Sequence, residues 1–197
     1  YEGEIRLDGI RQDEWTRNSV RASFGMVLQE TWLKSATVWE NIAYGRPNAS
    51  REEIIKAAKE AYCDGFINRL PNGYDTVLGE DGSILSQGQK QLLTIARAIL
   101  ADSKVLILDD STSAVDTATD AKIRKAFREE IPGTTKIIIA QRISSVQDAD
   151  RILVLDNGQI NGLGTHEELL KTNKIYQEVY NSQTQGGGDF DKQGGEQ

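Results

Sequence analysis

The sequence of 197 residues has little of what several large classes of protein require. Its only cysteine, Cys63, has no partner for an internal disulfide, and the single histidine, His166, leaves no Cys/His cluster for a metal. No apolar run is longer than about five residues, whereas a membrane-spanning helix needs about 20, and the start shows no secretory signal pattern. Because 30 acidic residues face 23 basic ones, direct nucleic-acid binding is not expected. We expect a reducing, cytoplasmic setting.

Apolar residues recur with periods that predict alternating helices and strands. Residues 1–9 alternate apolar and polar as in a half-buried strand that ends at an Asp8-Gly9 turn, and Phe24 to Leu28 predicts a buried strand. Residues 31–100 are dominated by helical patterns, at 38–44, 51–61 and 86–101. The remaining prediction is strand 104–109, helix 116–130, strand 135–140, short helix 144–147, strand 151–156 and helices 166–170 and 175–180.

This order of elements predicts the fold class. Strands that alternate with helices indicate βαβ units and a parallel sheet covered on both faces, so the class is α/β with an α-helical subdomain inserted at about residues 31–100. Residues 183–197 contain five glycines and little that could enter a core. They predict a disordered Gly-rich tail, which places the end of the ordered domain at residue 182.

One chemically suggestive pattern is the aliphatic run Val105 to Leu108, which ends in Asp109 and Asp110. In open parallel sheets, ligands bind beyond the carboxyl ends of the strands, and a carboxylate there suits Mg²⁺ held together with substrate phosphates. A plain strand end followed by a turn has the same appearance.

A second pattern, Leu85-Ser86-Gln87-Gly88-Gln89, runs straight into a helix. Serine and glycine at a helix start leave backbone N–H groups free at the positive end of the helix dipole, which suits a phosphate. Taken alone, the pattern also fits an ordinary serine N-cap with a glycine nearby.

Together and in this order, these patterns resemble the nucleotide-binding domain of an ABC (ATP-binding cassette) ATPase over residues 1 to about 180. The resemblance implies a P-loop NTPase-type core that binds ATP and Mg²⁺. It implies that residues 85–89 are the signature motif, that Ser113 to Asp116 form the D-loop, and that Asp109 of the Walker B strand and the Q-loop residue Gln29 serve the metal. The nucleotide contacts implied are Gln29, Ser86, Gln87, Gly88, Gln89 and Asp116. Residues 29–45, 79–82 and 164–170 are similar to exporter-type segments.

The sequence also departs from the family pattern. The phosphate-cradling loop Gly-x-x-x-x-Gly-Lys-Ser/Thr is absent and is expected upstream, so this stretch alone should not bind ATP strongly. Asp110 stands where the family has a water-polarising Glu; its shorter side chain sets the carboxylate back by roughly 1.5 Å, which can cost about a hundredfold in rate. Gln141 stands where a histidine is expected, and it does not titrate near neutrality.

The departures fall on one of two composite sites that the resemblance implies between paired domains. Asp110 and Gln141 belong to the chain's own catalytic site, whereas Ser86, Gly88 and Gln89 complete the site of a second nucleotide-binding domain. This resembles the degenerate half of a heterodimeric multidrug exporter at the cytoplasmic face of the membrane, with a transmembrane domain in the same chain. A slow homodimeric exporter, a non-transport ABC ATPase and a nucleotide sensor remain alternatives. Trp32, Trp39 and Tyr44 either contact the transmembrane part or pack within the helical insert.

Overall fold

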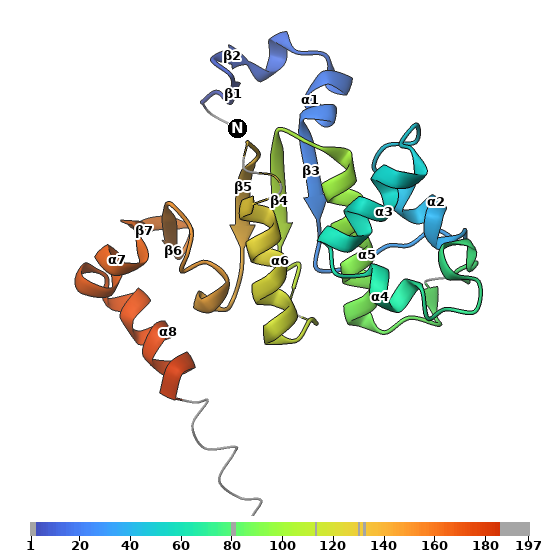
Figure 1. Ribbon diagram of the computed structural model, residues 1–197. Helices are drawn as coiled ribbons and strands as arrows, with labels where there is room; N and C mark the ends of the chain where they lie inside the picture. The colour runs from blue at the N-terminus through green and yellow to red at the C-terminus, as the bar shows by residue number, and fades with distance from the viewer. Residues whose placement is uncertain (1–2, 80–81, 113, 130, 132, 186–197) are drawn as a thin grey trace, which may run out of the picture. The chain divides into compact units, whose positions relative to one another are not determined.

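The computed structural model describes residues 3–79, 82–112, 114–129, 131 and 133–185. It divides into two compact units, residues 1–139 and 140–197. The first unit contains β1 (Arg6–Leu7), β2 (Ile10–Arg11), α1 (Arg17–Ser23), β3 (Phe24–Val27), α2 (Val38–Ala43), α3 (Arg51–Glu60), α4 (Asp64–Ile67), α5 (Gln87–Ala101), β4 (Val105–Asp109), α6 (Thr117–Glu129) and β5 (Thr135–Ile139) (Figure 1). The second contains β6 (Ile152–Asp156), β7 (Gln159–Gly164), α7 (His166–Thr172) and α8 (Lys174–Gln185).

A three-stranded parallel sheet forms the centre of the first unit, in the order β3-β4-β5. Val27 pairs with Leu108 and Asp109 pairs with Ile139, so the carboxyl ends of all three strands meet at one edge. The predicted parallel α/β core is therefore confirmed. The edge also brings the segment after β3 and the acids after β4 to the same end of the sheet.

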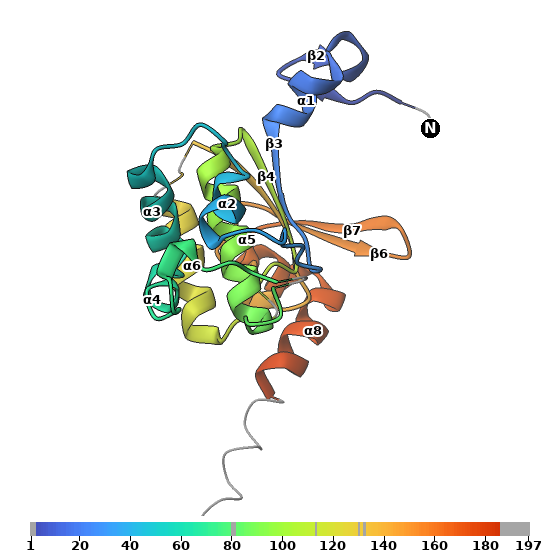
Figure 2. The ribbon, with the colours of Figure 1, turned by 90° about the vertical axis from the view of Figure 1, so that its right-hand side faces the viewer.

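Among the described residues of the first unit, helices cover only one face of this sheet, so the expectation of two covered faces was wrong for this unit. Leu106 and Leu108 are buried in the core with α5 and α6, but Met26, Ile137 and Ile139 are about half exposed. Each strand is added beside the previous one in the same direction, and right-handed crossovers then place successive helices on the same side. Figure 2 shows α5 and α6 on that side.

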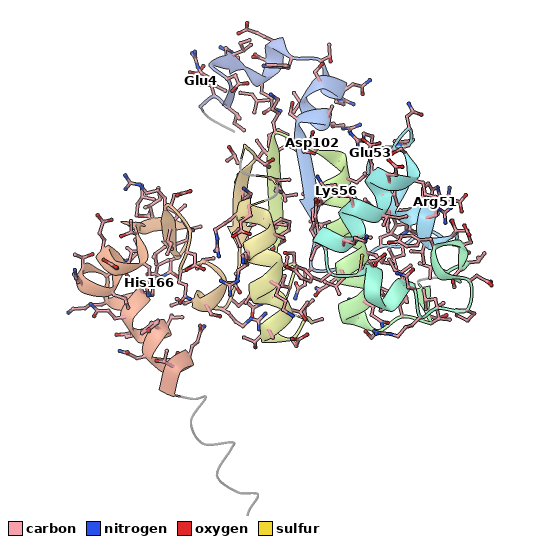
Figure 3. The ribbon with its side chains drawn as sticks, viewed as in Figure 1. Glu4, Arg51, Glu53, Lys56, Asp102 and His166 are labelled. Atoms are coloured by element: carbon pink, nitrogen blue, oxygen red, sulfur yellow. The ribbon has the colours of Figure 1, made fainter. Side chains whose placement is uncertain are left out.

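Helix α5 is the centre of the hydrophobic core of the first unit. Nearly every residue from Gln91 to Leu100 is buried, because α2 and α3 pack on one side of the helix and β3 lies on the other. Helices α2 to α5 lie where the sequence predicts a helical insert. Asp102 ends α5 in the left-handed conformation, with φ 50°, as is common at helix C-termini (Figure 3).

The N-terminal residues form a hairpin and a helix rather than one half-buried strand. The predicted Asp8-Gly9 turn is confirmed, with φ of 51° and 78°, and it joins the antiparallel strands β1 and β2. Both strands are largely exposed. Helix α1 was not predicted; its first turn is capped by the Thr16 side chain, which accepts a hydrogen bond from the Ser19 N–H.

The second unit differs from its prediction in topology. Strand β6 does not continue the parallel pattern but pairs antiparallel with β7, which the sequence analysis missed. Their hairpin and helices α7 and α8 enclose a small core of Ile143, Ile152, Leu169 and Tyr176. The predicted short helix is a single 3₁₀ turn, Ile143–Ser145. Helix α8 runs to Gln185, past the predicted start of the tail, and residues 186–197 lie outside the described residues. No helix in the described part of the chain is long and apolar enough to span a membrane.

Candidate functional site

The predicted signature motif forms the N-terminus of α5. The Ser86 hydroxyl accepts a hydrogen bond from the Gln89 N–H at 3.3 Å, and the Gln89 side-chain oxygen accepts one from the Ser86 N–H at 2.9 Å. This reciprocal capping box satisfies two backbone donors with uncharged groups and fixes the first turn. Buried Leu85 anchors the segment in the core, while Ser86 and Gln87 are exposed. The positive end of a 15-residue helix is thereby presented at the surface.

Two other predicted motifs touch this helix start. Gln87 donates from Nε2 to Thr31 Oγ1 at 3.2 Å, and Thr31 lies two residues after the predicted Q-loop residue Gln29. Gly88 lies against the loop after β4, so closely that a Cβ atom on it would be 2.8 Å from the Ala114 carbonyl oxygen. The structure therefore brings the signature, Q-loop and D-loop segments together, although they lie far apart in the sequence.

The two predicted acids lie at the carboxyl edge of the sheet. Asp109 is the last residue of β4, and Gln29 follows the neighbouring strand β3 and is exposed at the same edge. Asp110 adopts the left-handed conformation, with φ 44°, and its N–H donates to the Ile139 carbonyl at 2.8 Å. Aspartate tolerates this conformation better than most residues, which is a local reason for its presence. Both carboxyl groups are half-buried rather than sequestered.

This edge fits Mg²⁺ only as part of a larger site. No group of three or more His, Cys, Asp or Glu side chains gathers in the described residues. Magnesium usually takes one or two protein carboxylates and completes its shell with phosphates and water. Asp109 supplies one such carboxylate, Gln29 two residues after the neighbouring strand is the second predicted donor, and a nucleotide would supply the remaining oxygens.

Asp116 has a structural partner in addition to its predicted role at the nucleotide. Its Oδ1 accepts a hydrogen bond from the Thr119 N–H at 3.0 Å, so it caps the start of α6. Hydrogen bonds from the Thr119 side chain and backbone hold the pKa of Asp116 below its usual value. The carboxylate is exposed and ionised at neutral pH, and its contact with a nucleotide stays a prediction.

Gln141 and His166 lie in the second unit. Gln141 is exposed, and its backbone carbonyl accepts from Gln183 Nε2 at 2.8 Å, so the end of α8 holds this segment. The catalytic role of the Gln141 side chain stays a prediction. The His166 ring nitrogen Nδ1 is 2.8 Å from the Tyr176 hydroxyl, and the ring packs edge-on against Tyr176 and Tyr180 (Figure 3). His166 therefore has a packing role against these two tyrosines.

A contact between Arg97 of α5 and two aromatic residues was missed by the sequence analysis. Arg97 donates from Nε to the Asn41 carbonyl at 2.9 Å and from a terminal nitrogen to the Trp32 carbonyl at 3.2 Å. Its guanidinium lies 5.8 Å from the centre of the Trp32 ring and 5.3 Å from that of Tyr44. Burial lowers the pKa of Arg97. Arg97 thereby fixes the side chains of Trp32 and Tyr44 at the surface.

These contacts separate the three aromatic residues that the sequence analysis grouped. Trp32 and Tyr44 are 55% and 61% exposed and meet edge to face at 5.9 Å. Trp39 packs against the core beneath Arg51. The interpretation as packing within the insert therefore holds for Trp39, whereas Trp32 and Tyr44 form an exposed pair.

A parallel α/β core with an acid at a strand end and a capped helix start one loop away is an arrangement typical of nucleotide-binding domains. The profile of the family described as "ABC transporter" matches residues 1–113, and the chain belongs to this family.

Named relatives have the same segment within longer proteins. The chain is 48% identical over 182 residues to the uncharacterized ABC transporter ATP-binding protein YfiC of Bacillus subtilis, covering 92% of this chain and 30% of that protein. It is 49% identical to a fatty acid ABC transporter ATP-binding/permease protein of Mycobacterium bovis, covering 90% of this chain and 28% of the relative. A solved structure of a bacterial Atm1-family ABC exporter with ATP bound matches 93% of this chain and 32% of its own, at 43% identity and a TM-score of 0.90. The chain thus spans about a third of the length of such relatives.

Proposed function

We propose that this chain is the ATP-binding and ATP-hydrolysing part of a membrane exporter. The observation that carries the proposal is the start of α5, where the capped signature motif contacts the Q-loop segment at Thr31 and the D-loop segment at Ala114. The phosphate-cradling loop and the transmembrane domain would come from residues outside this sequence. The site would act at the cytoplasmic face of the membrane.

We further infer that the two ATP sites of the assembled transporter are unequal. Asp110 and Gln141 would weaken the chain's own ATP site. Asp110 has a shorter side chain than the family glutamate, and Gln141 does not titrate near neutral pH as the family histidine does. Ser86, Gly88 and Gln89 match the family pattern and would complete the site of a partner domain. The second nucleotide-binding domain would then carry Glu and His at the two altered positions.

The test is the double variant Asp110→Glu with Gln141→His in the intact transporter. Total ATP turnover is expected to rise about tenfold, since the longer carboxylate regains its position and the histidine its proton-transfer capacity. Each single variant serves as a control and is expected to give a smaller gain. Unchanged turnover in the double variant, with normal expression, would contradict the idea of a weakened site.

Subunit composition separates the proposed heterodimer from a slow homodimer. Native mass spectrometry of the transporter from its own membrane is expected to show a one-to-one complex with a second ABC chain. A complex of two identical chains would favour the homodimer and leave two weakened sites.

We propose that Trp32 and Tyr44 contact the transmembrane domain. They are exposed, and the Arg97 contacts hold them in place at little further entropic cost, as is typical of aromatic anchors at interfaces. Tyr44→Ala in the intact transporter is expected to lower transport more than ATP hydrolysis. Equal loss of transport and ATP hydrolysis would contradict a contact between this pair and the transmembrane domain.

A further inference from the structure

Gln91 is a buried polar residue that the predicted motifs do not use. It lies on α5, one turn after Gly88, and its side chain is 1% exposed. Its Oε1 accepts a hydrogen bond from the Ala114 N–H at 3.1 Å. Buried side-chain amides in proteins are nearly always hydrogen-bonded. Here the partner is the backbone of the loop after β4.

The loop that contains Ala114 is attached at both ends to predicted site residues. It begins directly after Asp109 and Asp110 and ends at Asp116, which caps α6. Between these ends the Val115 N–H donates to the Thr112 carbonyl at 3.1 Å, and the Val115 side chain is buried in the core. A displacement of the acids at the end of β4 therefore reaches Ala114 through only a few residues of a tightly turned loop.

Two independent contacts fix Ala114 to α5. The Gln91 side chain holds its N–H, and the bare Cα of Gly88 lies against its carbonyl oxygen, where a Cβ would be 2.8 Å away. The N–H and the carbonyl oxygen of Ala114 therefore both contact the first two turns of α5. The loop and the helix start cannot move independently while these contacts persist.

We propose that Gln91 is a positioning residue that couples the chain's own acid edge to the signature motif, and thereby links the two ATP sites. It is not among the predicted nucleotide and metal contacts, and it acts through Ala114. The proposal rests on the proposed function, because it assigns the acid edge to one ATP and the signature to the other. Its consequence is that turnover at one site depends on how firmly Gln91 holds the loop.

The experiment uses the intact transporter with Gln91→Met, which keeps the chain length but removes the amide oxygen. The first readout is hydrogen exchange at the Ala114 amide, which is expected to become about tenfold faster. The second is steady-state ATP hydrolysis, where kcat is expected to fall about tenfold while KM for ATP changes less than about twofold, because the residue positions the site rather than binding ATP.

Two further variants make the result specific. Thr94→Val is the matched control: Thr94 is also buried on α5, but among the described residues its hydroxyl donates to the Gln91 backbone carbonyl, at 2.8 Å, and not to the loop after β4. Both readouts should therefore stay at wild-type values. If Gln91→Met does not fold, Gly88→Ala disturbs the same contact from the helix side and is expected to speed Ala114 exchange.

The outcomes distinguish this inference from the proposed function. Wild-type exchange at Ala114 in the Met variant, or faster exchange with unchanged kcat, would overturn the coupling role. A wild-type transporter without ATP hydrolysis would overturn the proposed function itself, and that result is visible before any variant is compared.

Discussion

Four of the described helices begin with the same capping box, but they differ in the residue that closes it. Helices α2, α3 and α7 use a glutamate, Glu40, Glu53 or Glu168, whose carboxylate accepts from the N-cap backbone N–H. Helix α5 uses the amide of Gln89 instead. A carboxylate at this position places a negative charge on the positive end of the helix dipole, whereas an amide closes the box and leaves that end uncompensated.

Under the proposed function, this difference separates the three helices that are only capped from α5, whose N-terminus would bind a phosphate. A phosphate binds at a helix N-terminus through free N–H groups and the dipole, and a carboxylate already in place would repel it. The glutamate boxes place a negative charge at the positive end of the helix dipole, which stabilises α2, α3 and α7. The glutamine box gives up the charge interaction, worth about 0.3–1 kcal/mol at an exposed helix end, and keeps an anion site.

The largest effect is expected from Gln89→Glu, which turns the α5 box into one of the α2 kind. The new charge should repel an ATP phosphate by about 2–3 kcal/mol and lower ATP hydrolysis by the intact transporter about a hundredfold. Folding stability should stay equal or rise slightly, because glutamate suits this position. The matched control is Glu40→Gln, the reverse change on α2, which should leave hydrolysis unchanged. A Gln89→Glu transporter with normal turnover would refute the anion-site interpretation of α5.

A smaller effect is expected from removing the N-cap hydroxyl on either kind of helix. Ser50→Ala and Ser86→Ala should each lower the free energy of unfolding by about 1 kcal/mol, or about 2–4 °C in melting temperature for a chain of this size. Thermal unfolding of the two variants should therefore be similar. Only Ser86→Ala should also reduce ATP hydrolysis in the intact transporter, by about tenfold. Equal hydrolysis in both variants would mean that Ser86 is no more than a cap.

The sequence predicted helices α3 and α5 and the acid at the end of β4 because their signals are local. Serine followed three residues later by Glu or Gln marks the start of α3 at Ser50 and of α5 at Ser86, and both caps are present. An aliphatic run that ends in Asp109 marks the end of β4 in the same way. These features depend on neighbouring residues, which a sequence displays directly.

Most of the features that the sequence analysis missed depend on long-range contacts, and one, the β6-β7 hairpin, has a local signal. Asn157-Gly158, with φ of 47° and 77°, is a strong hairpin signal between β6 and β7, and it should have indicated an antiparallel pair. The one-sided covering of the sheet follows from strand order, which periodicity does not reveal. Arg97 meets Trp32 across 65 positions and Gln91 meets Ala114 across 23, so no local pattern could have joined them.

The smallest expected effect is the pH dependence of folding stability, which should differ between the glutamate capping boxes and the glutamine box of α5. Hydrogen bonds from the N-cap backbone and hydroxyl hold the pKa of Glu40, Glu53 and Glu168 below the ordinary value of 4.5. Because the folded pKa is depressed, the stabilisation is complete above about pH 4.5 and is lost as the pH falls through the folded values. The Gln89 box carries no such dependence, since an amide does not titrate.

A triple variant with Glu40, Glu53 and Glu168 each changed to Gln tests this directly by thermal unfolding between pH 3 and pH 7. The wild-type chain is expected to melt at a higher temperature than the variant near pH 7, and the gap is expected to narrow steadily below about pH 4.5. Glu178→Gln removes an exposed carboxylate from the interior of α8 and leaves every box closed, so it should melt like the wild type across the range. A gap that stays constant with pH would show that the carboxylates act as neutral hydrogen-bond acceptors, and the charge distinction between α5 and the other three helices would then lose its basis.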